Sequence, residues 1–271
     1  MRRLKQLGEN LNAYTVSFAV ELLEDIRQSY YQYVHPLLSD QPQLLQPKEL
    51  QEKDLGEYHL VNYPGTTLLW VSSNTAKTYN LYRQFLDKLD IIDDIKLLVD
   101  YREKIVMYCG FLVVSNVIRQ PKWHYDYRQG ANAYTLITPL LALSTNHGNL
   151  CYRDDRHKTN IYRYKLGEAI IFGEGFLHST EPYPPCSDIR VLVSLTCGTD
   201  KLGYWHITSR TIATQSRYFV LPCGCVVGTC NCYELFQLRL VRFHIWLFLR
   251  YLAPLGDNVL LYIGLTIKNK D

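Results

Sequence analysis

The sequence predicts a mainly β protein of the α+β class, in which an antiparallel barrel or sandwich follows a helical N-terminal half. Six apolar runs rich in β-branched residues fall within about ninety residues, and linkers rich in Gly, Asn, Asp and Pro separate them. The 22 tyrosines agree with this class, because tyrosine suits half-buried strands and wet pockets. With 271 residues the chain can bury a sizeable core, as one large domain or two smaller ones.

Helices are expected over about residues 1–100. Apolar side chains recur on a broad stripe over 10–34, which predicts an amphipathic helix. A polar loop containing glutamine and proline follows at 39–48. Residues 75–100 then predict one or two further helices, since their apolar side chains are spaced for one face.

The β half begins with KIVMYCGFLVVSNVI at 104–118, a long apolar run that predicts a buried strand. Further strands are expected at 133–143, 149–153, 160–164, 168–172 and 189–195. One domain is expected over 1–200, with its β core at about 101–200. Residues 201–271 are expected to form a Cys-rich and apolar C-terminal extension packed on the same domain.

Composition argues against several classes of function. The net charge is only +3, which is against a nucleic-acid-binding face and leaves a small molecule or a protein as the expected substrate. No run of about 18 uninterrupted apolar residues predicts a membrane span. The start of the chain predicts no export signal, so an intracellular, cytoplasmic protein is expected, with its eight cysteines as reduced thiols or ligands. Nothing in the sequence indicates the oligomeric state.

A histidine and an aspartate stand two positions apart in KWHYDYRQG, residues 122–130. Residues i and i+2 of an extended segment share a face, so His124 and Asp126 can both point into a barrel mouth. Roughly 0.4 such His-x-Asp triplets are expected by chance in a chain of this composition. The pair alone is therefore weak evidence, and a hydrogen-bonded pair on a sheet edge is the alternative.

A second histidine downstream strengthens the metal interpretation. In GEAIIFGEGFLHSTEP, residues 167–182, an apolar strand leads through two glycines to His178. With His124 and Asp126 it would complete a two-histidine, one-carboxylate triad, which leaves three adjacent positions open on Fe(II) for a bidentate co-substrate and O₂.

Arg190 opens the apolar strand IRVLVSL, where a buried guanidinium is costly without an anionic partner. Its planar fork suits the far carboxylate of a co-substrate, and Ser194 lies in phase to share that task. The alternative is a surface ion pair with Asp188, Glu181 or Glu174.

The order His-x-Asp, second His, Arg in a β-rich half resembles that of the Fe(II)/2-oxoglutarate-dependent dioxygenases. NHGNL at 146–150 resembles the Gly-containing turn and strand between the metal-binding motifs of the phytanoyl- and prolyl-hydroxylase-like branches. Residues 167–182 are similar to the stretch that delivers the distal histidine there. The resemblance covers about residues 104–200.

The resemblance implies a double-stranded β-helix, the jelly-roll or cupin-like fold, with N-terminal helices packed on one sheet. It also implies oxidative decarboxylation of 2-oxoglutarate to succinate and CO₂, coupled through O₂ to hydroxylation or desaturation of an unactivated C–H bond. Halogenating relatives replace the carboxylate with a small residue, so Asp126 favours hydroxylation or desaturation.

The resemblance also assigns roles by position. The iron ligands would be His124, Asp126 and His178. Arg190 would anchor 2-oxoglutarate, with Ser194 and Tyr134 as further contacts. Two other functions stay open: a non-catalytic cupin-like binding or scaffold module, and a cupin metalloenzyme that does not use 2-oxoglutarate.

The residues next to His124 and Asp126 are expected to pack in the core or to line the rim of the candidate site. Tyr125 and Arg128 are candidate substrate contacts, whereas Trp123 and Tyr127 are expected to pack. Tyr134 and Thr135 alternate along one strand, and either could line the barrel. Two further histidines in polar loops are expected to be solvated: His147 and His157.

A cysteine cluster lies in the C-terminal extension, at Cys223, Cys225, Cys230 and Cys232. Four thiolates could hold a structural zinc ion, but the C-x-C pairs are closer than the usual zinc spacing, so thiols without metal are favoured. Zinc nucleobase deaminases and zincin proteases are disfavoured because their P-C-x-x-C and H-E-x-x-H motifs are missing, and no phosphate-binding loop motif occurs.

Overall fold

The computed structural model describes residues 3–45, 50–62, 67–144 and 147–230. The chain divides into two units, Met1–Val227 and Gly228–Asp271. The first unit runs past residue 200, where the sequence suggests the end of the core domain. Among the described residues, no helix is long and apolar enough to cross a membrane.

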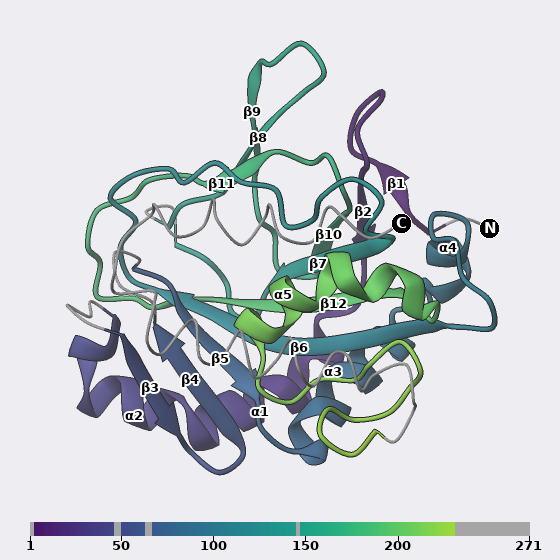
Figure 1. Ribbon diagram of the computed structural model, residues 1–271. Coiled ribbons are helices and arrows are strands. Elements are labelled where there is room, and N and C mark those ends of the chain that lie inside the picture. The colour runs from purple at the N-terminus through teal and green to yellow at the C-terminus, as the bar shows by residue number, and fades with distance from the viewer. Residues whose placement is uncertain (1–2, 46–49, 63–66, 145–146, 231–271) are drawn as a thin grey trace, which may run out of the picture. The chain divides into compact units, whose positions relative to one another are not determined.

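Two antiparallel sheets form the core of the first unit in its described part (Figure 1). The large sheet has the strand order β1-β2-β10-β7-β12-β6-β5-β4-β3, and the small sheet has the order β11-β8-β9. The strands are β1 (Lys5–Gln6), β2 (Ala13–Ser17), β3 (Gln51–Asp54), β4 (Tyr58–Asn62), β5 (Leu69–Ser73), β6 (Ile105–Ser115), β7 (Ala133–Pro139), β8 (Leu150–Arg153), β9 (Thr159–Tyr162), β10 (Glu168–Phe172), β11 (His178–Thr180) and β12 (Arg190–Thr199). The predicted mainly β class is confirmed.

From β6 to β12 the chain alternates between the two sheets. β6, β7, β10 and β12 lie in the large sheet, and β8, β9 and β11 lie in the small one. Two isolated bridges, Ile118 with Tyr183 and His124 with His178, add the segment after β6 to the free side of β11. This alternation is that of a double-stranded β-helix, so the predicted fold is confirmed. It brings segments distant in sequence to one barrel.

β12 is the central strand, paired with β6 on one side and β7 on the other. All ten of its residues are buried. A strand covered on both faces should be apolar throughout, so Arg190 and Ser194 within it need a reason that packing does not supply.

Helices cover one face of the large sheet. They are α1 (Glu24–Tyr33), α2 (His35–Asp40), α3 (Ala76–Lys88), α4 (Ile92–Lys96) and α5 (Trp205–Gln215), with 3-10 turns at Val20–Leu23, Pro42–Leu45 and Leu202–Tyr204. α3 begins at a capping box between Thr75 and Thr78 and packs on β6 with Tyr82 and Phe85 buried. The predicted packing of N-terminal helices on a sheet is confirmed.

The sequence prediction is wrong in part of the N-terminal half. Residues 13–17, expected in a helix, form β2, which pairs with β10 along five positions. β3, β4 and β5 extend the large sheet between 51 and 73, where no strand is predicted. These strands owe their conformation to partners far away in the chain, which a local pattern does not reveal. The helix α5 is also unpredicted.

Gly110→Ala is expected to lower the free energy of unfolding by about 1–3 kcal/mol. A Cβ at position 110 would lie 2.4 Å from Cγ of Tyr82, which is fully buried between α3 and β6. Urea unfolding measures the loss. Gly203→Ala is the matched control, because a Cβ there meets nothing within 4 Å. Equal stability of the two variants would contradict this close packing of α3 on β6.

Candidate functional site

Backbone pairing holds His124 and His178 opposite each other. The His124 N–H donates to the His178 carbonyl at 3.0 Å, and the His178 N–H donates to the His124 carbonyl at 3.1 Å. The two imidazole centroids lie 4.4 Å apart as a result. Two segments far apart in the chain are thus joined at one pair of histidines.

Each imidazole is also fixed in one tautomer. Nδ1 of His124 lies 2.8 Å from the Lys122 carbonyl, and Nδ1 of His178 lies 3.0 Å from the Phe176 carbonyl. A carbonyl oxygen only accepts, so in the neutral rings both Nδ1 atoms carry the proton and both Nε2 atoms keep a lone pair. The two Nε2 atoms face one oxygen, Oδ1 of Asp126, at 3.5 and 3.6 Å.

The other carboxylate oxygen of Asp126 is held by β7. The Thr135 hydroxyl donates to Oδ2 of Asp126 at 2.7 Å. The Tyr127 hydroxyl lies 2.9 Å from Oγ1 of Thr135 and supplies the donor there, because the Thr135 proton goes to the carboxylate. This chain of hydroxyls orients the carboxylate and leaves Oδ1 directed at the two imidazoles.

His124, Asp126 and His178 can together hold a metal ion, since their ligand atoms all lie within 4.8 Å of one another. Two imidazoles and one carboxylate are the donor set typical of non-haem Fe(II). The side chain of His178 is 6% exposed and that of Asp126 10%, whereas that of His124 is 53% exposed. The site therefore opens to solvent on the His124 side.

Electrostatics favour the metal-binding protonation state in Asp126 and His178, whereas in His124 the effect of burial is outweighed by Asp126, which raises the pKa of that imidazole. Burial alone would raise the pKa of Asp126, but the imidazoles of His178 and His124, which are positively charged when protonated, outweigh it and hold this pKa at about 2. Burial lowers the pKa of His178, against the opposing charge of Asp126. At neutral pH the carboxylate is ionised and the buried imidazole is neutral, so a metal need not displace protons from them.

Arg190 is buried inside the barrel, with 1% of the residue exposed. Its Nε donates to the Gly148 carbonyl at 3.0 Å, and its Cζ lies 5.3 Å from the centroid of the Tyr164 ring. Nη1 and Nη2 have no hydrogen-bond partner among the described residues. Buried charged donors without partners are costly, so this geometry fits a carboxylate that accepts from both nitrogens.

The carboxylates proposed as surface partners of Arg190 do not pair with it. None of Asp188, Glu181 and Glu174 accepts from the guanidinium. Glu181 accepts from the backbone and side-chain amides of Asn149, and Glu174 accepts from two backbone N–H groups. The surface alternative for Arg190 is therefore wrong.

Arg190 and Asp126 of the triad both influence the pKa of Tyr164. Burial raises the pKa of Tyr164 to about 12, while Arg190 opposes this rise and the charge of Asp126 adds to it. Both charges thus act on one buried phenol.

Along β12, Arg190, Leu192 and Ser194 share a face because their positions alternate, and Leu192 belongs to the same core cluster as Tyr164. The guanidinium and Ser194 hence lie on the inside of the barrel.

Thr135 lines the site in place of Tyr134. Successive residues of a strand point to opposite faces, and the Thr135 hydroxyl reaches Asp126. The Tyr134 hydroxyl instead donates to Oδ1 of Asn12 at 2.8 Å. Tyr134 is therefore not brought to Arg190 or to the triad. The sequence leaves open whether Tyr134 or Thr135 faces the inside of the barrel, and the hydrogen bond from Thr135 to Asp126 decides this.

Of the residues around the His-x-Asp pair, two pack against other side chains and two lie at the rim of the site. Tyr127 is buried against Thr135, and the Trp123 ring stacks under the guanidinium of Arg153 at 4.8 Å. Tyr125 is 54% exposed and lines a cavity of about 600 Å³ with Arg128. The substrate contacts of these last two stay a prediction.

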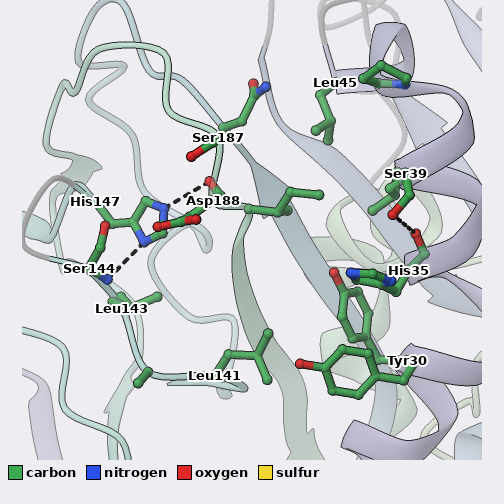
Figure 2. Close-up of a pocket in the computed structure, with 16 residues that line it drawn as sticks. Tyr30, His35, Ser39, Leu45, Leu141, Leu143, Ser144, His147, Ser187 and Asp188 are labelled. Carbon is green, nitrogen blue, oxygen red and sulfur yellow. Dashed lines mark hydrogen bonds between the residues drawn. The ribbon is translucent and has the colours of Figure 1, made fainter.

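The prediction that His147 is solvated is wrong, because the structure buries it. Its Nδ1 accepts from the Ser144 N–H at 3.2 Å, and its Nε2 donates to the Asp188 carbonyl at 3.1 Å (Figure 2). The bond to Asp188 ties the loop after β7 to the residues before β12, and His147 directly precedes Gly148, the acceptor for Arg190. His157, by contrast, is exposed as expected.

The predicted zinc site is only partly described. Cys232 lies outside the described residues, and Cys230 belongs to the second unit, whereas Cys223 and Cys225 belong to the first. Zinc binding by these cysteines stays a prediction.

No family model and no curated protein matches the chain. Several solved structures are similar to it. EctD from S. alaskensis with bound Fe is 13% identical at a TM-score of 0.49, over 74% of this chain and 82% of that one. HygX from Streptomyces hygroscopicus with nickel and 2-oxoglutarate bound is 11% identical at 0.48, over 70% and 84%. A Pseudomonas putida prolyl-4-hydroxylase is 12% identical at 0.44, over 70% and 94%.

Thr135→Val is expected to weaken the binding of Co(II) or Mn(II) by about tenfold to a hundredfold. Valine keeps the shape but removes the hydroxyl that orients Asp126. Calorimetric titration measures the affinity. Thr135→Ser, which keeps the hydroxyl, should bind metal almost as the wild type does. Thr138→Val is the control on the opposite face, where the hydroxyl donates to the Glu168 carbonyl. Unchanged affinity in Thr135→Val would contradict the orienting role.

Proposed function

We propose that the chain is an Fe(II)- and 2-oxoglutarate-dependent oxygenase. The observation that carries this proposal is the buried Arg190, whose Nη1 and Nη2 have no partner among the described residues and lie in the same barrel as a two-histidine, one-carboxylate cluster. A metal site alone could bind many different co-substrates. A buried guanidinium beside it selects one that is anionic, and 2-oxoglutarate has a carboxylate at each end.

The roles follow from the positions of the side chains. His124, Asp126 and His178 would hold the iron, and Arg190 would take the far carboxylate of 2-oxoglutarate, with the hydroxyl of Ser194 as a further donor. With both bound, the site would have the chemistry to convert 2-oxoglutarate and O₂ into succinate and CO₂ and to oxidise a C–H bond of a substrate.

The remaining residues of the barrel position these groups and exclude water. Phe172 and Phe176 pack against the imidazole of His178, with ring centroids 4.6 and 5.6 Å away. Apolar rings there keep the inner side of the site dry, which strengthens the electrostatic attraction between Arg190 and an anion. The outer side, where His124 is exposed, is the side from which a substrate would enter.

The direct test measures succinate formed from 2-oxoglutarate with Fe(II), ascorbate and O₂. Succinate is expected from the wild type and is expected to fall to background in His178→Ala. His206→Ala is the matched control, since this histidine is exposed on α5 and its Nδ1 contacts the Gly203 carbonyl. Normal turnover in His178→Ala would reject the proposal.

Arg190→Met is expected to abolish stabilisation by 2-oxoglutarate without unfolding the protein. Replacing a buried guanidinium with an apolar side chain is often neutral or stabilising, so the ligand-free Tm should stay or rise. Thermal unfolding with Mn(II) should show a rise in Tm on adding 2-oxoglutarate to the wild type, because the ligand binds only the folded state. Arg190→Lys keeps the charge but not the planar fork, and should give a smaller rise. The same rise in Arg190→Met and the wild type would contradict the anchoring role.

A further inference from the structure

A cleft of about 530 Å³ opens beside His124. One wall comes from Leu68 and Trp70 at β5, and a second from residues between 118 and 122 in the segment after β6. The third comes from Ser179 and Thr180 of β11, which follow His178 directly. The cleft therefore reaches the solvent-facing side of the candidate metal site, and a molecule in it would lie against His124.

One side of the cleft is apolar and continues the lining of the barrel. Trp70 pairs with Val113, and Val113 pairs with Leu192. Directly paired residues of a sheet share a face, and Leu192 belongs to the core cluster inside the barrel. The indole of Trp70 thus lies in the same row as that core. Ile118, 7% exposed, adds a second apolar surface, so this side suits an apolar or aromatic body.

The rim of the cleft is cationic. Arg119 and Lys122 both line it, and both residues are exposed. None of the described residues that line the cleft is an aspartate or a glutamate. Two positive charges above a low-dielectric wall attract an anion and raise its local concentration. Arginine can in addition bind a carboxylate or a phosphate through two parallel hydrogen bonds.

We propose that this cleft binds the substrate, and that the substrate is an organic anion with an apolar or aromatic body. The anionic group would sit at Arg119 and Lys122, and the body would lie along Trp70 and Ile118 towards His124. This inference rests on the proposed oxygenase function. It narrows the substrate from any small molecule or protein to one chemical class.

The test compares two probes of equal shape and different charge, 2-naphthoate and 2-naphthamide, by calorimetric titration of the full chain. We expect the carboxylate to bind roughly fivefold more tightly than the amide, the size of effect typical of exposed ion pairs. In the double variant Arg119→Gln/Lys122→Gln this preference should vanish. The double variant Arg156→Gln/Lys158→Gln makes the same charge change on the exposed β8–β9 turn, and it should keep the preference.

Two results of this titration would overturn the proposal. One is equal affinity of the wild type for the two probes. The other is a preference that survives in Arg119→Gln/Lys122→Gln but is lost in Arg190→Leu, which would place the carboxylate inside the barrel. Trp70→Ala should weaken both probes alike, because it removes the apolar wall and leaves the charges.

The broadening of the probe's proton NMR resonances by bound Mn(II) tests the substrate cleft separately from the proposed oxygenase function. With Mn(II) bound, the proton resonances of 2-naphthoate should broaden, because the cleft adjoins His124. In His178→Ala, which should no longer hold Mn(II), the probe should bind without broadening. Bound Mn(II) without broadening of the probe would overturn the cleft as the substrate site. Charge-selective probe binding in a wild type that holds no Mn(II) would overturn the metal site and leave the anion selectivity of the cleft standing.

Discussion

The site depends on a guanidinium that is buried inside the barrel and whose two terminal nitrogens have no partner in the part of the chain that the structure describes. Arg190 stands on the central strand, β12, where every residue is buried and where an apolar side chain would pack without cost. Charged groups in such surroundings cost several kcal/mol unless they are paired. The fold carries this cost in its ligand-free form, and an anion held by both nitrogens would offset it. Under the proposed function, binding of a carboxylate co-substrate to Arg190 would therefore stabilise the folded state.

The double-stranded β-helix supplies the rest of the geometry by alternating its strands between two sheets. That alternation sets the segment after β6 beside β11, so that His124 and His178 exchange backbone hydrogen bonds. Asp126 follows His124 by two positions and is oriented from β7 by Thr135. Each of the three side chains is thus oriented by a backbone or hydroxyl partner and would present its free ligand atom to a metal ion. Preorganisation of this kind reduces the reorganisation that binding would otherwise require.

The sequence was informative where a residue type conflicts with its surroundings, and uninformative where the conformation depends on a distant partner. Arg190 in an apolar strand and His178 after a glycine-flanked strand stand out locally, and so does the His-x-Asp pair. The sequences of β2 and β5 do not stand out, because these strands are stabilised by pairing with β10 and β6, which lie far away in the chain. The sequence alone does not show whether Tyr134 or Thr135 faces the inside of the barrel, because either set of alternating residues on β7 could line its wall. The orientation of β7 in the structure decides between them. The burial of His147 likewise depends on a distant partner, the Asp188 carbonyl, to which its Nε2 donates.

One anaerobic titration tests most directly whether metal triad and guanidinium act as one site. Fe(II) is added to the protein with saturating 2-oxoglutarate while visible absorption is recorded. A co-substrate that chelates the iron while its far carboxylate is bound by Arg190 should give a weak metal-to-ligand charge-transfer band that saturates at one iron per chain. The band should be lost in Arg190→Leu at the same 2-oxoglutarate concentration. A wild type that binds both Fe(II) and 2-oxoglutarate yet shows no band would contradict the account.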